Sequence, residues 1–340
     1  MKPVTIDDVA KKAGVSIKTV SRVVNREPNV RAATKEKVEE AIKELGYRPN
    51  PSARGLAGRR SYIVGLLYDN PSPQYLAHLH AGVMEACLPR HYGLALSHFI
   101  STAPDLADNV RGWLRQAQID GVVLTPPLSD HAGLLETIKA MGVPSVVVSS
   151  KGPGDIPSVV IDEEAAAYQM TKHLIDVGHK DIAFIIGHPD HYASALRLAG
   201  FRRAMKDAGL SVPDGWVRQG YFDFASGREA AQVLLSGSKR PSAIFASNDD
   251  MAAGVLYEAH ARKLLVPDDI AIAGFDDTPL SRQVWPGLTT VRQPIRSIGE
   301  TAGQIVLDAI AAGGLAAADA PVTMAFELKF RGSTGEGADL

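Results

Sequence analysis

The sequence predicts two fold classes in one chain. An all-α helix-turn-helix unit is expected over residues 1–49, and an α/β body of two doubly wound lobes with parallel sheets over residues 61–340. Apolar residues recur at helical spacing in the first part, whereas short apolar strands alternate with helices after residue 60. The charge divides in the same way, because residues 1–60 hold 14 Lys and Arg against 7 Asp and Glu, and the other 280 residues hold 22 against 31.

The composition is typical of a globular protein and leads us to expect a cytoplasmic one. At 340 residues and 45% hydrophobic content, the chain can form two or three domains. Cys87 is the single cysteine, so an internal disulfide is impossible and a reducing compartment fits. The N-terminus has no apolar core of signal-peptide length, and no run of about 18 apolar residues predicts a membrane span.

Residues 5–24 have the pattern of two short helices joined by a tight turn. Thr5 can cap the first helix with Asp8 as its capping-box partner, and Gly14 stands where a left-handed residue must end that helix. Ser16 can cap the second helix. A third helix is expected from about residue 32 to residue 45. This order is the helix-turn-helix arrangement.

The outward face of the second helix is polar and basic, as a DNA-reading helix requires. Since its N-terminal part would enter the major groove, Arg22 could contact guanine bidentately, Lys18 could reach the same edge, and Ile17 could touch a thymine methyl. Residues expected at phosphates are Thr5, Ser16, Thr19, Ser21 and Asn25. A merely solvated polar face is the alternative, and it explains less of the pattern.

Residues 50–60, NPSARGLAGRR, read as a linker that contains an unexplained leucine, Leu56. Asn50 can cap a helix, but residues 52–57 span barely two turns, too few to persist alone. We therefore expect this hinge to fold only on DNA. The side chains expected at the flanking phosphates are Arg54, Arg59 and Arg60.

From residue 61 onward the alternation of strands and helices predicts parallel sheets with crossover helices. Two sets of strands are expected, the second beginning near residue 158. Residues 288–313 are expected to cross back to the first lobe, and residues 323–334 to form a last strand pair. The first lobe is therefore predicted as residues 61–161 with 292–322, and the second as 162–291 with 323–335.

Polar residues gather where the strands end, which is where doubly wound sheets bind ligands. A carboxylate and a guanidinium can hydrogen-bond vicinal hydroxyls, and an aromatic face can pack on a sugar ring. The expected ligand-binding residues are Asp69, Tyr75, Thr125, Ser149, His191, Arg197, Phe222, Asn248, Asp276 and Trp285.

Simpler explanations exist for most of these residues. The pairs Asn248-Asp249 and Asp276-Asp277 could serve merely as caps of the helices and turns that follow them. Arg197 could lie on the surface, and Phe222 could belong to the hydrophobic core. His188, Asp190 and His191 are metal-ligand types without helical spacing, so no metal is expected. No phosphate loop, nucleophile elbow or zinc-enzyme motif occurs, so neither a cofactor nor catalysis is expected.

The segments DVAKKAGVSIKTVSRVVN, KVEEAIKELGYRPN and LAG together resemble the lactose-repressor/galactose-repressor (LacI/GalR) family, and the resemblance runs through the whole chain. It implies a body like a periplasmic sugar-binding protein. It further implies that Arg197, Asn248 and Asp276 hold effector hydroxyls or polar ring edges. First-lobe contacts would come from Asp69, Thr125 and Ser149, and Phe222 would stack.

The resemblance also implies how the DNA-binding end works. The leucine matching Leu56 wedges into the minor groove at the operator centre, Ala53 faces its partner helix, and Tyr47 and Arg54 join the DNA contacts. Arg31 departs from the family, which usually has a small capping residue there. Family tetramers carry an extra leucine heptad helix beyond the body and none is present, so a homodimer on a pseudo-palindromic operator is expected.

Together these features predict a DNA-binding repressor of carbohydrate-utilisation genes that responds to a small effector. A sugar or glycoside is favoured over a purine, because purine-type members carry Arg and Thr where His191 and Ala193 stand. A solute-binding protein for transport is one alternative, which the basic N-terminal end and the absent signal peptide oppose. A sugar-converting enzyme using Asp249 and Asp276 is another, and no second catalytic motif supports it.

Overall fold

The computed structural model describes residues 4–24, 30–47, 60–150, 155–314 and 320–335. The chain divides into two compact units, Met1–Tyr62 and Ile63–Leu340. Most of the expected hinge lies outside the described residues, and so do five of the expected DNA contacts: Asn25, Ala53, Arg54, Leu56 and Arg59.

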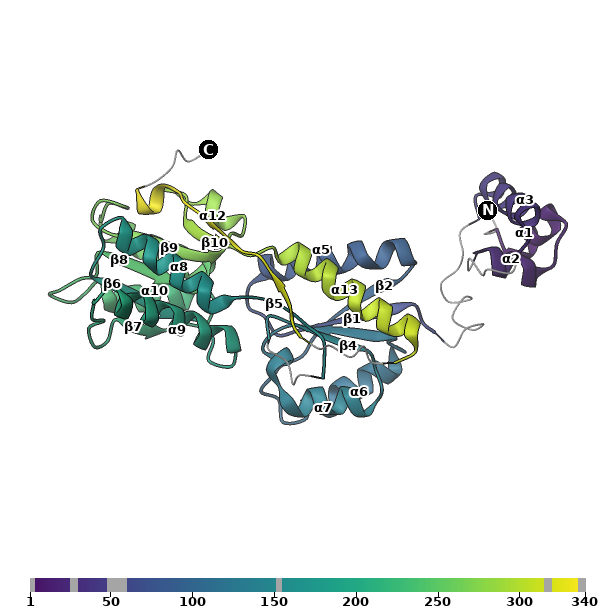
Figure 1. Cartoon of the computed structure of the whole chain (residues 1–340), viewed down its shortest axis with the longest axis horizontal. Coiled ribbons are helices and arrows are strands. Elements are labelled where there is room, and N and C mark those ends of the chain that lie inside the picture. The colour runs from purple at the N-terminus through teal and green to yellow at the C-terminus, as the bar shows by residue number, and fades with distance from the viewer. Residues whose placement is uncertain (1–3, 25–29, 48–59, 151–154, 315–319, 336–340) are drawn as a thin grey trace. The chain divides into compact units, whose positions relative to one another are not determined.

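The described residues of the N-terminal unit form three helices (Figure 1), and these pack around a small valine core. Its helices are α1 (Ile6–Ala13), α2 (Ile17–Val24) and α3 (Ala32–Leu45). The buried core comprises Val9, Ala10, Val20, Val23, Val38 and Ala41. Because each helix contributes only two buried residues, all three must pack together for any of them to be stable.

The expected caps of this unit are present. Thr5 donates from its backbone N–H and its hydroxyl to the Asp8 carboxylate, at 2.9 and 2.7 Å. Gly14 ends α1 with φ of 67°, and Ser16 accepts a hydrogen bond of 3.2 Å from the Thr19 N–H. Arg31 precedes α3 without a side-chain cap, which agrees with the departure noted in the sequence.

The C-terminal unit contains two six-stranded sheets among its described residues. The first follows the order β11-β5-β4-β3-β1-β2 and is parallel throughout. Its strands are β1 (Ile63–Tyr68), β2 (Gly93–His98), β3 (Gly121–Leu124), β4 (Ser145–Val148), β5 (Ser158–Ile161) and β11 (Val322–Met324). In Figure 1 helices cover both of its faces: α5 (Pro73–Cys87) and α13 (Ile295–Ala312) on one, α6 (Leu106–Gln116) and α7 (Ala132–Ala140) on the other.

The second sheet follows the order β12-β10-β9-β8-β6-β7, and only its β10–β12 pair is antiparallel. Its strands are β6 (Ile182–Ile186), β7 (Val217–Gln219), β8 (Ala243–Ala246), β9 (Ala271–Asp276), β10 (Thr289–Arg292) and β12 (Glu327–Lys329). Its helices are α8 (Glu163–Asp176), α9 (Tyr192–Asp207), α10 (Phe224–Leu234), α11 (Asp249–Ala261) and the short α12 (Leu280–Gln283). The two lobes are thus both doubly wound, as predicted.

Two details of the predicted topology are wrong, although the predicted end of the first lobe at residue 161 agrees with the strand pairing. The second set of strands begins with β6 and not near residue 158, because β5 pairs with β4 and β11 in the first sheet. Residues 323–334 do not form a strand pair either, since β11 pairs with β5 whereas β12 pairs with β10 of the other sheet. The first lobe therefore extends to Met324, close to the expected boundary at about residue 322, and Arg292, which was expected in the first lobe, is the last residue of β10 in the second. The crossing of α13 back to the first lobe is confirmed, because α13 packs on α5, β3 and β4.

The crossing of α5 and α13 depends on glycine. A Cβ at Gly82 would lie 1.9 Å from the backbone oxygen of Arg296, and one at Gly299 would lie 2.4 Å from that of Leu79. Gly82→Ala is therefore expected to lower the free energy of unfolding by about 1–3 kcal/mol, the usual cost of overpacking, measured by urea denaturation.

Gly112→Ala is the matched control for this variant. Gly112 lies in α6, and a Cβ at this position would meet no atom within 4 Å, so alanine there should stabilise the helix by about 1 kcal/mol. Equal effects of the two substitutions would contradict the close crossing.

Candidate functional site

A small cavity lies between the carboxyl ends of strands from both sheets. Its volume is about 30 Å³. Segments that follow β1, β3 and β4 form one wall, and segments that follow β6, β7, β8 and β9 form the other. The lining residues are Asn70, Ser72, Tyr75, Pro126, Ser149, His191, Ala193, Arg197, Phe222, Asn248 and Asp276.

Seven of the ten expected ligand-binding residues line this cavity: Tyr75, Ser149, His191, Arg197, Phe222, Asn248 and Asp276. Three do not. The Asp69 carboxylate accepts a hydrogen bond from Ser101 N–H at 2.7 Å and pairs with His98 Nε2 at 3.0 Å. Thr125 is fully buried and donates to the Leu67 carbonyl, and Trp285 is 73% exposed. Asp69, Thr125 and Trp285 therefore do not line this cavity, and their contact with an effector stays a prediction.

Arg197 is the fixed positive charge of the cavity wall. It is buried, its Nε donates to Glu163 Oε2 at 2.8 Å, and its Nη1 donates to the Ser247 carbonyl. The guanidinium carbon also lies 3.6 Å from the centre of the Phe275 ring. Surface placement of Arg197 is thereby excluded. Because Glu163, the ring and the carbonyl hold it on three sides, Arg197 can donate to a ligand without losing rotamer freedom on binding.

Asp276 places a carboxyl group in the cavity wall, and burial partly suppresses its negative charge at neutral pH. Burial raises its pKa to about 7, while the charge of Arg197 and a hydrogen bond from Gln293 act against that rise. Gln293 Nε2 donates to Asp276 Oδ1 at 2.6 Å. Near neutral pH the carboxyl can therefore either accept a hydrogen bond from a ligand hydroxyl or donate one.

His191 supplies an uncharged hydrogen-bonding group. Burial, with smaller contributions from His188 and Arg197, lowers its pKa to about 3, so the imidazole is neutral. Its Nε2 is buried without a hydrogen-bond partner among the described residues. Those residues also contain no group of three or more His, Cys, Asp or Glu side chains placed to hold a metal.

The aromatic residues nearly fill the cavity. The Tyr75 hydroxyl and Ser149 Oγ are hydrogen-bonded at 2.9 Å, and both side chains line the wall. Phe222 adopts φ of 63°, and its ring lies 5.1 Å from that of His191. The remaining volume is about that of one water molecule, so a sugar ring can enter only if Tyr75 or Phe222 moves, or if the lobes open.

The capping explanation holds for Asn248 and does not exclude a place in the cavity. Asn248 Oδ1 accepts from the Met251 N–H at 2.9 Å at the start of α11, and its Nδ2 donates to the Phe222 carbonyl at 2.8 Å. Asp249 lies outside the cavity lining, with its carboxylate accepting hydrogen bonds from Thr278 and Thr290. Burial and, after it, the charge of Asp276 raise the pKa of Asp249 well above its ordinary value, but of the two carboxyl groups Asp276 lines the cavity and Asp249 does not.

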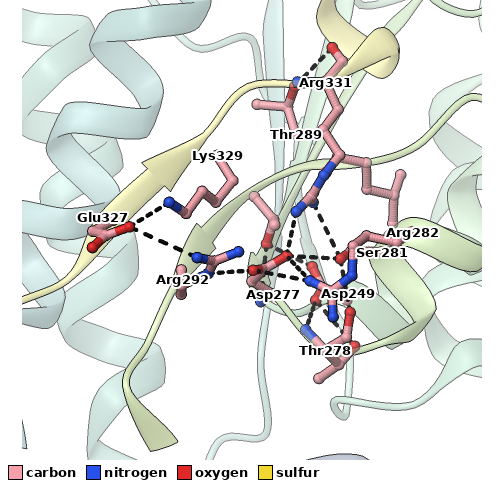
Figure 2. A network of polar contacts seen from close by, with 12 residues as sticks. Asp249, Asp277, Thr278, Ser281, Arg282, Thr289, Arg292, Glu327, Lys329 and Arg331 are labelled. Atoms are coloured by element: carbon pink, nitrogen blue, oxygen red, sulfur yellow. Dashed lines mark hydrogen bonds and ion pairs between the residues drawn. The ribbon is translucent and has the colours of Figure 1, made fainter. Parts of the chain in front are cut away.

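Asp277 is a structural centre. Figure 2 shows its carboxylate among three arginines, accepting from Arg331, Arg292 and Arg282 as well as from the Ser281 hydroxyl. Burial alone would raise the pKa of Asp277, but its bonds to Arg331 and Arg292 outweigh burial and hold that pKa below its ordinary value of 3.8. The network ties the segment after β9 to β10, α12 and the C-terminal Arg331.

Sequence reasoning missed several residues of the site. Asn70, Ser72, Pro126 and Ala193 line the cavity, although none of them is among the ten expected ligand-binding residues. Ser72 Oγ also donates to Asp250 Oδ2 at 2.8 Å and so links the two lobes. Glu163 was missed because a helix-starting glutamate usually faces water. Its only signal is the acidic run DEE directly after an apolar strand.

In the N-terminal unit, α2 presents the expected DNA-facing residues. Ile17 is 47% exposed although it is apolar, Lys18 is exposed, and Thr19, Ser21 and Arg22 are partly exposed. Thr5 and Ser16 are exposed cap residues. Tyr47 is partly buried against the core of this unit, and that burial raises its pKa.

Across the described part of the chain, no helix combines the length and the apolar character needed to cross a membrane.

Comparison with known proteins agrees with both units. The model of the family described as "Bacterial regulatory proteins, lacI family" matches residues 5–50, and that of "Periplasmic binding protein-like domain" matches residues 171–334. Catabolite control protein A of Priestia megaterium is 40% identical over 312 residues, covering 89% of this chain and 91% of that protein. The ribose operon repressor of Escherichia coli K12 is 37% identical over 308 residues, covering 90% and 93%.

Solved structures are similar over nearly the whole chain. The lac repressor dimer bound to operator and the anti-inducer ONPF has a TM-score of 0.78 and 29% identity, covering 98% of this chain and 99% of that one. The complex of the transcriptional regulator CelR with cellobiose has a TM-score of 0.74 and 30% identity, covering 97% and 99%. These relatives are DNA-binding regulators rather than enzymes. The chain likewise belongs to the lacI family of bacterial transcriptional regulators.

Proposed function

We propose that this protein represses carbohydrate-utilisation genes by binding a pseudo-palindromic operator as a homodimer in the cytoplasm. A sugar or glycoside bound between the lobes would control its affinity for DNA. The observation that carries the effector proposal is the convergence of Arg197, His191 and Asp276 on one cavity at the strand ends. The first is a fixed hydrogen-bond donor, the second a neutral ring, and the third a carboxyl group that can accept or donate. Together they can form hydrogen bonds with several hydroxyl groups of a sugar.

A purine effector is the second candidate, because purine repressors are also relatives. PurR of Vibrio campbellii is 36% identical over 312 residues. The cavity favours hydroxyls over a purine ring edge, since the position before α9 presents a neutral His191 and the next cavity residue, Ala193, offers no polar side-chain atom.

We also propose that the effector acts through the angle between the lobes. Two of the described hydrogen bonds between the lobes run from Ser72 to Asp250 and from the Tyr192 N–H to Asp130. Opening or closing the cleft changes these contacts. Only the difference in effector affinity between the two lobe arrangements can shift DNA binding.

The basic test is DNase footprinting of the promoter region beside the gene, with and without a saccharide that raises the melting temperature of the protein. We expect protection of an inverted repeat, and we expect the protection to change when the saccharide is added. The rise in melting temperature identifies the saccharide as a ligand, because a compound that binds the folded state raises its stability. Absence of any protected repeat at low salt would refute the proposal.

Effector affinity is expected to rise with pH. The pKa of Asp276 is raised to about 7, so binding a hydroxyl to the ionised carboxylate must release its proton below that pH. Between about pH 6 and about pH 8 the ionised fraction grows roughly tenfold, and the dissociation constant should fall by up to about that factor. Isothermal titration calorimetry would measure it.

Asp276→Asn is the control for this pH dependence. The asparagine variant should bind the same saccharide more weakly and with a flat profile over this range. A variant that keeps the wild-type slope would assign the titration to another group.

A further inference from the structure

A second and larger cavity lies where the chain crosses from β10 into α13. Its volume is about 250 Å³, room for roughly eight water molecules. Both lobes form it, because α5 and α13 pack on the first sheet whereas β9 and β10 belong to the second. Its lining includes Asp276, Arg282, Arg292, Gln293 and Arg296.

The lining of this hinge cavity is positively charged. Arg282, Arg292 and Arg296 reach it from α12, β10 and α13, and each side chain is between 43% and 64% exposed. Arg282 and Arg292 share the Asp277 carboxylate with Arg331, so one negative charge serves three arginines (Figure 2).

The neighbouring acids do not remove this surplus. Glu327 lies 3.9 Å from Arg292 but is also paired with Lys329, and Glu85 pairs with Arg296. Of the eight charged groups in these pairs, five are basic and three are acidic. Two further acids act on the cluster, Glu300 beside Arg296 and the partly ionised Asp276 of the lining, so a small positive charge of less than about +1 is left for a ligand to neutralise.

The start of α13 adds uncharged donors. This helix has 18 residues and begins after Pro294, which provides no side-chain cap. The N–H groups of Ile295, Arg296 and Ser297 belong to its first turn, so no carbonyl of the helix can accept a hydrogen bond from them. All three residues line the cavity.

An unsatisfied buried group lies at the same place. Gln293 is only 5% exposed and lines the cavity, and its Oε1 has no hydrogen-bond partner among the described residues. Its amide nitrogen donates to Asp276. An acceptor left unpaired in a cationic cavity suits a ligand that also carries a hydroxyl, since that hydroxyl can donate to the amide oxygen.

We propose that this hinge cavity binds a phosphoryl group, with Arg282, Arg292 and Arg296 and the first-turn amides of α13 as its donors. Such a group carries several acceptor oxygens and negative charge, which matches planar guanidinium donors from three directions. The site is distinct from the proposed sugar cavity, with which it shares only Asp276.

Phosphoryl binding here would act on the lobes directly. Arg282 and Arg292 belong to the second lobe, and the amides of α13 belong to the first. An anion held by both sets strengthens one lobe arrangement at the point where the chain passes between the lobes. It therefore gives the regulator a second input beside the sugar cavity.

The test measures binding of potassium phosphate to the full-length protein by calorimetry, with potassium chloride at equal ionic strength as the reference. Neither operator nor sugar is needed, so a failure here leaves the proposed function untouched. Because the basic N-terminal unit can also attract phosphate, variants must locate the site. Arg282→Gln and Arg296→Gln should each weaken binding at least about fivefold, as expected for loss of one charge-assisted contact.

Two further variants make the result decisive. Glu85→Gln frees Arg296 from its ion pair on α5 and should tighten phosphate binding. Arg111→Gln on α6 removes a comparably exposed arginine paired with Asp108 and should change nothing. Equal affinities for the wild type and for the Arg282, Arg296 and Glu85 variants would overturn the proposal.

Further titrations with glucose 6-phosphate and with glucose distinguish the two sources of a phosphoryl group, a phosphorylated sugar and free phosphate. Tighter binding of glucose 6-phosphate than of phosphate, with loss in the Arg296 variant, indicates a phosphorylated sugar. Equal binding of the two indicates free phosphate. Binding of glucose 6-phosphate that none of these variants affects would place it elsewhere and contradict the site.

Discussion

Replacing Arg22 by glutamine is expected to weaken operator binding by about 30-fold to 10⁴-fold while leaving the fold intact. Arg22 lies on the partly exposed face of α2 beside Lys18 and Ile17, and it is not part of the buried core of its unit. One bidentate arginine–guanine contact is worth about 1–3 kcal/mol of discrimination, and a dimer on two half-sites loses it twice. Fluorescence anisotropy with operator and scrambled DNA at fixed salt measures the effect.

Lys12→Gln separates base reading from charge. Lys12 pairs with Glu44 at 2.7 Å, so its substitution removes the same formal charge from the same unit at a site away from α2. It should change operator and scrambled DNA affinity alike and only slightly. If Arg22→Gln also weakens both DNAs by one common factor, then Arg22 contacts phosphate and another residue reads the base.

Asp277→Asn is expected to lower the free energy of unfolding by about 2–4 kcal/mol. The substitution keeps the size of the side chain and tolerates the φ of 53° at this position, so it tests the charge. Breaking a fully buried ion pair costs about 3–5 kcal/mol, and the value expected here is lower because Arg282 and Arg292 are half-exposed and can be hydrated. Urea denaturation at pH 7 provides the measurement.

The effect of Asp277→Asn should also depend on pH in one direction. The pKa of Asp277 is lowered on folding, so its contribution to stability is present above about pH 4 and is lost as the pH falls through the folded value. The difference between wild type and variant should therefore shrink in acid.

Asp308→Asn is the control. Asp308 pairs with Arg90 on an exposed surface, where an ion pair contributes at most about 1 kcal/mol. A loss as large as that of the Asp277 variant would mean that the three arginines contribute no more than a surface pair.

Local signals in the sequence were enough to predict the N-terminal unit. Thr5 with Asp8, Gly14 and Ser16 all perform the expected roles, because caps and turns depend on neighbours within four residues. The pairing of β11 with β5 in one sheet and of β12 with β10 in the other could not be predicted in this way. The hydrogen-bonding partner of a strand lies far along the chain, and an apolar strand has the same pattern in either sheet.

In the candidate site, too, some residues could be predicted from local patterns whereas others depend on packing. Arg197, Asn248 and Asp276 could be placed at the ends of strands by motif and resemblance, and they line the cavity. Thr125 follows a strand equally well, yet its hydroxyl donates to the Leu67 carbonyl, so its side chain serves the neighbouring strand. A strand end fixes the edge of the sheet, whereas the direction of the side chain depends on packing.

The helix-turn-helix unit and the doubly wound lobes could be predicted from the residues alone, because periodicity, caps and turns act over short distances, and the repressor family from the resemblance of three segments. The ion pair of Glu163 with Arg197, the raised pKa of the buried Asp276 and the sharing of Asp277 by three arginines became visible only in the folded chain. Burial and charge pairing join residues from distant segments. No local pattern encodes them, and they determine what the cavities of this regulator can bind.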